Sequence, residues 1–249
     1  MQDTNAEIVS NKAVLGPYWS VRLSTGWKDY QPGQFVMVKA PKAFLRRPFS
    51  ILDLKDGVIE ICYKVVGKGT FGLSLLKAGG KLQVLGPLGK GFEIRKTGRQ
   101  IMVAGGYGFA PFFGLAKKLG GNCSLFYGAK NITHLIYLDE FKKMGVNLYL
   151  STEDGSIGRK GIVTDHFRDV LPDNGAIAVY GCGPGKMLDA VNKICMQSAG
   201  KLKISCQLSL ESYMACGIGV CHGCVTKNSK GEYVRVCKEG PVFDGEELT

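Results

Sequence analysis

Four cysteines near the C-terminus have the residue type and spacing to bind a metal cluster. Cys216, Cys221, Cys224 and Cys237 follow the pattern C-x4-C-x2-C-x12-C. The first three have the spacing of plant-type iron–sulfur sites, in which a fourth cysteine lies further along the chain and four thiolates hold a [2Fe–2S] cluster. The pattern therefore predicts a [2Fe–2S] cluster bound by these four side chains.

Glycines between the cysteines favour the same interpretation. Gly217, Gly219 and Gly223 let a short loop turn tightly and direct backbone N–H groups at sulfur. Two alternatives stay open: a set of thiols without metal, and a structural zinc site, although zinc sites usually combine two C-x2-C pairs and this loop has one. The other five cysteines are dispersed and are expected to be small buried residues: Cys62, Cys123, Cys182, Cys195 and Cys206.

Two segments in the first third of the chain have residues suited to phosphate binding. In Arg47-Pro48-Phe49-Ser50 a guanidinium precedes a hydroxyl by three residues, and such a pair can contact a diphosphate. The motif is short, so an ordinary surface arginine is the alternative. Val66 to Gly72 is a glycine-rich turn before a predicted helix, where free N–H groups form an anion site and Thr70 is the expected N-cap.

Two further turns each join a predicted strand to a predicted helix. Gly105 to Pro111 occupies the position at which a dinucleotide pyrophosphate sits on a Rossmann-like sheet, although it does not match G-x-G-x-x-G. Tyr180 to Met187 is the second such turn. Two turns at strand carboxyl ends indicate one shared crevice, and plain tight turns are the alternative.

The elements that position these motifs fall into two patterns. Residues 6 to 95 contain short β-rich runs separated by glycine, which predict an antiparallel barrel with a helical stretch from Phe71 to Lys77. After Thr97, strands alternate with helices, which predicts a parallel sheet. The predicted strands of both regions are 36–39, 49–54, 58–66, 81–85, 100–104, 124–128, 147–151, 176–180 and 203–208, and the predicted helices after Thr97 are 111–119, 138–143, 162–170 and 186–197.

The remaining tail, Ser212 to Thr249, is too short to fold around a core of its own, so other parts of the chain must hold it. The composition, 45% hydrophobic and 21% charged in 249 residues, is that of a globular protein. The net charge of +11 fits a basic surface, attraction of anionic cofactors or an acidic partner. Lys and Arg are scattered without interleaved aromatics, which does not favour nucleic-acid binding.

Location is predicted from what the sequence lacks. It contains no run of 18 apolar residues for a membrane span and no apolar signal segment at its N-terminus. Nine cysteines, an odd number, fit a disulfide framework badly. We therefore expect a cytoplasmic protein without a membrane partner.

Taken together, these motifs resemble the ferredoxin reductase-like flavoproteins and, more narrowly, the electron transfer subunits of two-subunit, NAD-dependent dihydroorotate dehydrogenases. The resemblance covers nearly the whole chain, and its most specific part is the cysteine tail. The segments that carry it are Arg47-Pro48-Phe49-Ser50, Gly67-Lys68-Gly69-Thr70, Gly86-Pro87-Leu88-Gly89, Gly105 to Pro111, Glu153-Asp154-Gly155-Ser156, Tyr180-Gly181-Cys182-Gly183-Pro184, Met214 to Gly219 and Gly240-Pro241-Val242-Phe243.

The resemblance implies a multidomain protein: an FAD-binding antiparallel β-barrel (1–97), an α/β parallel-sheet NAD-binding domain (98–210) and a [2Fe–2S] domain (211–249). The cluster ligands would be Cys216, Cys221, Cys224 and Cys237. The implied FAD residues are Arg47, Pro48, Phe49, Ser50, Cys62, Tyr63, Lys64, Gly69 and Thr70. The implied NAD residues are Gly105, Gly106, Gly108, Cys182 and Gly183.

The chain departs from the family in its nicotinamide turn, which usually reads G-G-G-x-G. Tyr107 fills the third position here, where its ring would either crowd the pyrophosphate or stack on the cofactor. Cys182 matches a family cysteine that approaches the nicotinamide, and a purely structural cysteine is the alternative. Glu211 is expected near the flavin, and no residue is assigned a catalytic role.

The resemblance further implies a relay. An FMN-containing catalytic partner subunit oxidises dihydroorotate, and electrons pass through the [2Fe–2S] cluster and FAD to NAD+ in a heterotetramer of two plus two chains. Four alternatives stay open: the reductase subunit of an NAD(P)H–ferredoxin oxidoreductase, that of a hydrogenase or sulfide-oxidising complex, a redox sensor, and a zinc-bearing nucleic-acid-binding module.

Overall fold

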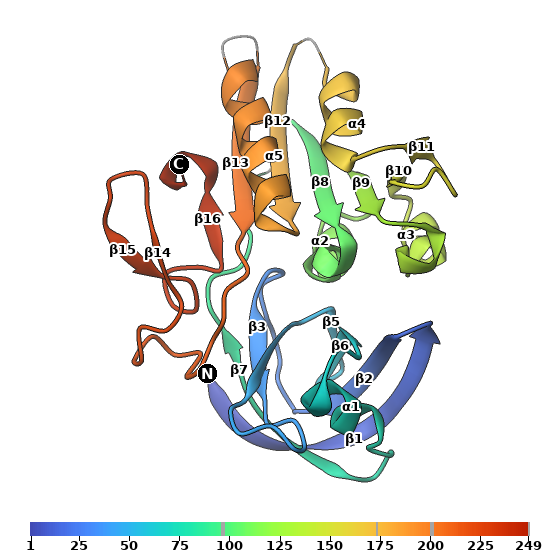
Figure 1. Cartoon of the computed structure of the whole chain (residues 1–249), viewed down its shortest axis with the longest axis vertical. Coiled ribbons are helices and arrows are strands. Elements are labelled where there is room, and N and C mark those ends of the chain that lie inside the picture. Colours follow the sequence, from blue (N-terminus) through green and yellow to red (C-terminus); the bar gives the residue numbers. More distant parts are fainter. Residues whose placement is uncertain (96–97, 173, 200–201, 249) are drawn as a thin grey trace.

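The computed structural model describes residues 1–95, 98–172, 174–199 and 202–248. It consists of a curled antiparallel sheet, a parallel sheet between two layers of helices, and a C-terminal tail packed against both (Figure 1). Within these residues, no helix is both long and apolar enough to span a membrane.

The first unit is a seven-stranded antiparallel sheet in the order β4-β3-β7-β1-β2-β6-β5. Burial alternates along β7, as expected where one face of a strand covers a core. Ile8, Val21 and Ile61 are among its fully buried side chains. The elements are β1 (Gln2–Leu15), β2 (Tyr18–Ser24), β3 (Phe35–Val38), β4 (Arg47–Ser50), β5 (Asp53–Lys55), β6 (Val58–Lys64), α1 (Lys68–Ser74) and β7 (Lys81–Leu88).

This sheet is a half-barrel, so the predicted antiparallel barrel is only partly confirmed. The strand predicted over Phe49 to Leu54 is in fact two strands, β4 and β5, which lie at opposite ends of the strand order. Only the buried pair Ile51-Leu52 separates them, and their backbone N–H groups donate to Gln34 and Glu60. The sheet must therefore curl until its ends approach, although the strand pairing itself does not close among the described residues.

The second unit is a parallel sheet, as predicted, and helices cover both of its faces. Its strand order is β11-β10-β9-β8-β12-β13-β16, and only β16 runs antiparallel. Helices α2 and α3 pack on one face and α4 and α5 on the other. The elements are β8 (Arg99–Gly105), η1 (Gly106–Phe109), α2 (Ala110–Lys118), β9 (Ser124–Ala129), η2 (Ile132–His134), α3 (Leu138–Lys143), β10 (Asn147–Thr152), β11 (Arg159–Lys160), α4 (Val163–Val170), β12 (Ala176–Cys182), α5 (Gly185–Ser198) and β13 (Lys203–Ser209).

The tail is held by contacts with both sheets. Its last strand, β16 (Val242–Asp244), pairs with β13, and the 3-10 turn η3 (Gly245–Glu247) follows. Cys237 and Phe243 belong to a small apolar cluster completed by Phe35 and Met37 of the first sheet. The other tail elements form a hairpin, β14 (Val225–Lys227) and β15 (Tyr233–Arg235). The tail is thus held by packing against the two sheets, as expected for a segment too short to have a core of its own.

Candidate functional site

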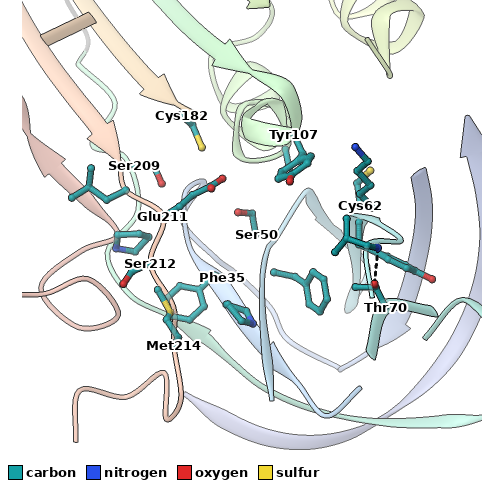
Figure 2. Close-up of a pocket in the computed structure, with 18 residues that line it drawn as sticks. Phe35, Ser50, Cys62, Thr70, Tyr107, Cys182, Ser209, Glu211, Ser212 and Met214 are labelled. Carbon is teal, nitrogen blue, oxygen red and sulfur yellow. Dashed lines mark hydrogen bonds between the residues drawn. The ribbon is translucent and has the colours of Figure 1, made fainter. Parts of the chain in front are cut away.

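Two adjoining cavities lie in the crevice between the antiparallel sheet and the parallel sheet. The first, here called the sheet-side cavity, lies between β3, β4 and β6 and the segment Ser209–Met214 (Figure 2). The second, the turn-side cavity, lies over the carboxyl ends of β8, β9, β10 and β12. Carboxyl ends of parallel strands are where open α/β sheets bind ligands.

Most of the residues predicted to bind FAD line the sheet-side cavity. Seven of the nine do so: Pro48, Phe49, Ser50, Cys62, Tyr63, Lys64 and Thr70. The other two, Arg47 and Gly69, lie close together outside that lining, with the Arg47 Nε about 4.0 Å from where a Gly69 Cβ would stand. Apolar walls with a few converging polar groups are typical of cofactor sites.

The prediction that Thr70 is the N-cap of α1 is wrong. Gly67 is the N-cap, and Thr70 lies three residues into the helix. Its hydroxyl reaches back and accepts hydrogen bonds from the N–H groups of Val66 (2.9 Å, dashed in Figure 2) and Gly67 (3.2 Å). Because those donors are already satisfied, Thr70 orders the turn rather than leaving the N–H groups of Val66 and Gly67 open for an anion.

Several lining residues of the sheet-side cavity were not predicted. Phe35 comes from β3, and Leu210, Ser212 and Met214 come from the segment that leads to Cys216. For the last three residues, the sequence offers one clue, their position: a segment between the last strand and the cluster cysteines must cross the crevice. Glu211, expected near the flavin, lines both cavities.

The two glycine turns meet in the turn-side cavity, as their strand positions suggested. Gly105 and Gly106 line it. Gly108 and Gly183 instead pack the two turns together: a Cβ on Gly108 would collide with the Cys182 carbonyl oxygen, and a Cβ on Gly183 would lie 2.9 Å from the Gly105 nitrogen. These two glycines are therefore needed for close packing of backbone on backbone.

Cys182 lines the sheet-side cavity, not the turn-side cavity. Burial raises the pKa of its thiol to about 12, the Glu211 carboxylate adds to the shift, and a hydrogen bond with Ser209 opposes it. At neutral pH Cys182 is therefore a protonated thiol. Burial in the crevice also raises the pKa of Glu211, although part of its side chain is exposed.

His134 lines the turn-side cavity together with Tyr18, and neither residue was among the predicted site residues. Its Nδ1 lies 2.9 Å from the Asn131 Oδ1, and its ring meets the Tyr18 ring edge-on at 6.0 Å. Lys130 and Glu153 follow β9 and β10 in the same cavity. Only the fold brings Tyr18 and His134 together, because Tyr18 lies on β2 of the first sheet and His134 on η2 of the second unit, far apart in the sequence.

Three of the four predicted cluster cysteines lie in the loop before β14 and Cys237 follows β15, with backbone N–H groups directed at their sulfurs. Gly219 N–H donates to the Cys237 Sγ at 3.1 Å, and Ile218 N–H donates to the Cys216 Sγ at 3.4 Å. Burial alone would raise the pKa of Cys216, but N–H groups from Cys221 and its neighbours lower it to about 6. A loop that stabilises a thiolate before metal arrives suits a thiolate ligand.

Backbone hydrogen bonds link the four cysteines in two pairs. Cys221 N–H donates to the Cys216 Sγ at 3.5 Å, and Cys237 N–H donates to the Cys224 Sγ at 3.4 Å. Burial and the neighbouring Cys224 thiol raise the pKa of Cys237 to about 12. Across the described ranges, no three His, Cys, Asp or Glu side chains gather closely enough to hold a single metal ion. An arrangement of the ligands in two pairs suits the two irons of a [2Fe–2S] cluster, each of which takes two cysteines.

Two family models match parts of the chain. Residues 211–249 match the "Iron-sulfur cluster binding domain of dihydroorotate dehydrogenase B". Residues 102–193 match the "Oxidoreductase NAD-binding domain".

Curated relatives align over almost the full length. The electron transfer subunit of dihydroorotate dehydrogenase B (NAD+) from Caldanaerobacter subterraneus subsp. tengcongensis is 41% identical, with 98% of this chain and 97% of the relative covered. The protein of the same name from Clostridium acetobutylicum is 44% identical over 88% of this chain and 87% of its own length.

A solved structure of an NADH-dependent reduced ferredoxin–NADP oxidoreductase also has this fold. Its TM-score is 0.84 at 31% identity, and 100% of this chain and 91% of that chain are covered. The cytochrome P450 reductase of Amycolatopsis, with a TM-score of 0.71 at 23% identity over 82% of this chain and 69% of its own, shares the fold. The architecture is therefore that of ferredoxin reductase-like proteins with an added C-terminal iron–sulfur domain.

Proposed function

The chain belongs to the family of electron transfer subunits of NAD-dependent dihydroorotate dehydrogenase B, and we propose that it carries electrons between a partner subunit that oxidises dihydroorotate and NAD+. Such a relay serves pyrimidine biosynthesis. When bound, the [2Fe–2S] cluster supplies single-electron transfer, FAD accepts one or two electrons, and the nicotinamide exchanges hydride.

The sheet-side cavity is the proposed FAD site. Phe35 and Phe49 supply apolar walls, Ser50 supplies a hydroxyl, and Lys64 supplies a positive charge at the boundary with the second cavity. The Arg47 guanidinium is the proposed diphosphate contact outside the lining, because a planar fork of donors suits phosphate oxygens. Gly69 leaves room beside it.

The turn-side cavity is the proposed nicotinamide site, with the backbone of Gly105 and Gly106 at the pyrophosphate. The single observation that carries the proposal is the segment 209–214. It lines the sheet-side cavity and continues directly into the loop with Cys216, Cys221 and Cys224. One short stretch of chain thus connects the proposed flavin site to the proposed cluster site.

The proposed partner is an FMN-containing catalytic subunit in a complex of two plus two chains. The cluster loop and the segment before it expose apolar side chains: Tyr213 is 96% and Val220 73% exposed. Apolar groups this exposed are typical of surfaces that another protein covers. A cytoplasmic location belongs to the proposal as well, because the cysteines in this chain are free thiols.

The experiment is anaerobic co-purification with the FMN-containing protein encoded by a neighbouring gene. NADH formation is then measured after dihydroorotate is added. NADH formation that needs both subunits supports the relay and the pathway. If no NADH forms while NADH still bleaches the flavin, the chain transfers electrons but serves a different oxidoreductase. Each subunit alone is the matched control.

The likeness to the NADH-dependent reduced ferredoxin–NADP oxidoreductase favours a second candidate: the reductase subunit of such a complex. The two candidates differ in the partner chain and not in the cavities described above. Reduction of NADP+ by reduced ferredoxin and NADH in the co-purified complex, without a response to dihydroorotate, would favour this second candidate.

A further inference from the structure

Tyr107 stands at the boundary between the two cavities. Only three side chains in the described part of the chain line both cavities: Lys64, Tyr107 and Glu211. Lys64 and Glu211 are flexible chains with charged ends, whereas Tyr107 presents a flat ring. In Figure 2 this ring hangs from the end of β8 into the sheet-side cavity, opposite Ser50 and Glu211.

The backbone under this ring is fixed, but the ring itself has freedom to turn. Gly106, with a φ of +56°, and Gly108, packed against the Cys182 carbonyl, set the course of the chain on either side. The Tyr107 side chain is 47% exposed. By contrast, Tyr180 is fully buried and its hydroxyl donates to the Gln100 Oε1 at 2.9 Å. Exposed side chains change rotamer within nanoseconds.

The proposed reaction requires contact across this boundary. Hydride passes between two rings only when the reacting atoms come within about 3–3.5 Å of each other. A nicotinamide held by the turn-side cavity must therefore enter the space that Tyr107, Lys64 and Glu211 enclose, where it would meet a flavin in the sheet-side cavity.

We propose that the Tyr107 ring is a gate between the two cavities, which turns aside when the nicotinamide ring enters to meet the flavin. The inference rests on the proposed function and adds to it a role for Tyr107. The gate would act on the nicotinamide half of the cofactor alone, because the turn-side cavity extends away from Tyr107 to Lys130 and Glu153, at β9 and β10, where the adenosine half would have room.

A gate has a measurable thermodynamic signature. If the open position is about 10% populated, the dissociation constant of a ligand that needs it is raised about tenfold. Removing the ring should lower that constant by the same factor and leave unchanged the affinity for a ligand that does not pass the gate.

The test compares two ligands on the FAD- and cluster-loaded protein by calorimetry. 1,4,5,6-Tetrahydro-NAD has a nicotinamide-like ring but cannot donate hydride, and ADP-ribose lacks the ring altogether. For Tyr107→Ala we expect about tenfold tighter binding of tetrahydro-NAD and no change for ADP-ribose. Tyr107→Phe, which keeps the ring, should behave like the wild type, as should Tyr233→Ala on the exposed tail hairpin.

The outcomes separate this inference from the function on which it rests. If Tyr107→Ala still binds ADP-ribose but does not bind tetrahydro-NAD more tightly, the gate is wrong. Weaker binding would mean that the ring stacks on the cofactor, and unchanged binding that it has no role in binding. If the wild type binds neither ligand, the proposed nicotinamide site is wrong and the gate falls with it. Should Tyr107→Ala fold poorly, Tyr107→Gly also removes the ring and gives the same test.

Discussion

The α/β unit and the C-terminal tail are of similar importance to the proposed electron path, but they are stabilised differently. The α/β unit buries its own aromatic side chains on both faces of the sheet, such as Phe112 on one side and Phe167 on the other. The tail contributes Val236 and Phe243 to an apolar cluster that needs Phe35 and Met37 from the first sheet.

This difference predicts two kinds of cooperativity. A unit with its own core unfolds as a whole, whereas a segment held by borrowed packing and by metal ligands can open by itself. For such a segment the free energy of metal binding is also folding free energy. The tail should therefore respond to loss of the cluster, and the α/β unit should not.

The largest expected effect comes from a cluster ligand. In Cys221→Ser the loop loses one of its four thiolates, so the cluster and the transfer of electrons to the partner should be lost while FAD stays bound. Iron and sulfide content, the flavin spectrum and dihydroorotate-dependent NADH formation measure this. Cys206→Ser, in a half-buried thiol on β13, is the control. Retained activity with the partner would sink the relay.

The second effect is on the α/β core. Phe167 is fully buried on α4, so Phe167→Ala should lower the free energy of unfolding by about 3–5 kcal/mol. Denaturant titration should show a single shifted transition for this unit. Iron content per folded molecule should equal that of the wild type, and cluster loss at mild denaturant would contradict the separation of the two regions.

The third effect is on the contact between tail and sheet. Gly217 has a φ of +72°, and a Cβ there would collide with the Met37 side chain. Gly217→Ala should cost about 1–2 kcal/mol for the left-handed backbone, with the collision in addition. Gly231→Ala is the matched control, because its φ is +78° and nothing lies within 4 Å. We expect faster cluster bleaching in Gly217→Ala alone, and equal rates in the two variants would show that the Met37 contact is unimportant.

The smallest effect concerns an ion pair inside the tail. Hydrogen bonding from Arg235, whose NH2 group lies 2.5 Å from a Glu239 oxygen, lowers the pKa of Glu239 from 4.5 to about 2. A carboxyl group whose pKa is lowered in the folded protein stabilises the fold at pH values above its ordinary pKa. This contribution is lost as the pH falls towards the lowered pKa. Since the pair is partly exposed, Glu239→Gln should cost under about 1 kcal/mol.

Denaturant titrations of the variant and the wild type test this prediction. The difference between their free energies of unfolding should be largest at neutral pH and should shrink at about pH 3, within the window between the two pKa values. A difference that persists or grows in acid would mean that Glu239 acts through packing and not through its charge.

The same contrast explains what the sequence could predict. In the α/β unit every predicted strand and helix is found within two residues of its expected bounds, because apolar strands and glycine turns are local signals. The cluster cysteines are also recognisable from their spacing in the sequence. The prediction placed no strand over β1, a 14-residue strand in which only Ala6 and Ile8 are buried, so its sequence lacks a clear apolar alternation.

Features that depend on distant partners were beyond the sequence. The division of the predicted strand 49–54 into β4 and β5 depends on Ile51-Leu52 linking the two ends of the first sheet, and the sheet-side cavity needs residues 209–214 to cross it. The strand β16 has three residues, too few for a periodic pattern, and exists because β13 offers unpaired backbone groups. Such elements are set by tertiary contacts and not by local propensity.

The pairing of β16 with β13 has a consequence for the protein's behaviour at high concentration. β16 covers what would otherwise be the open edge of β13, with Leu208 opposite Phe243. An uncovered edge strand is a template for pairing with another chain, and hence for aggregation. The segment that carries the cluster cysteines thus also works as a guard against self-association, and a chain shortened before Val242 would be prone to precipitate even with its parallel sheet intact.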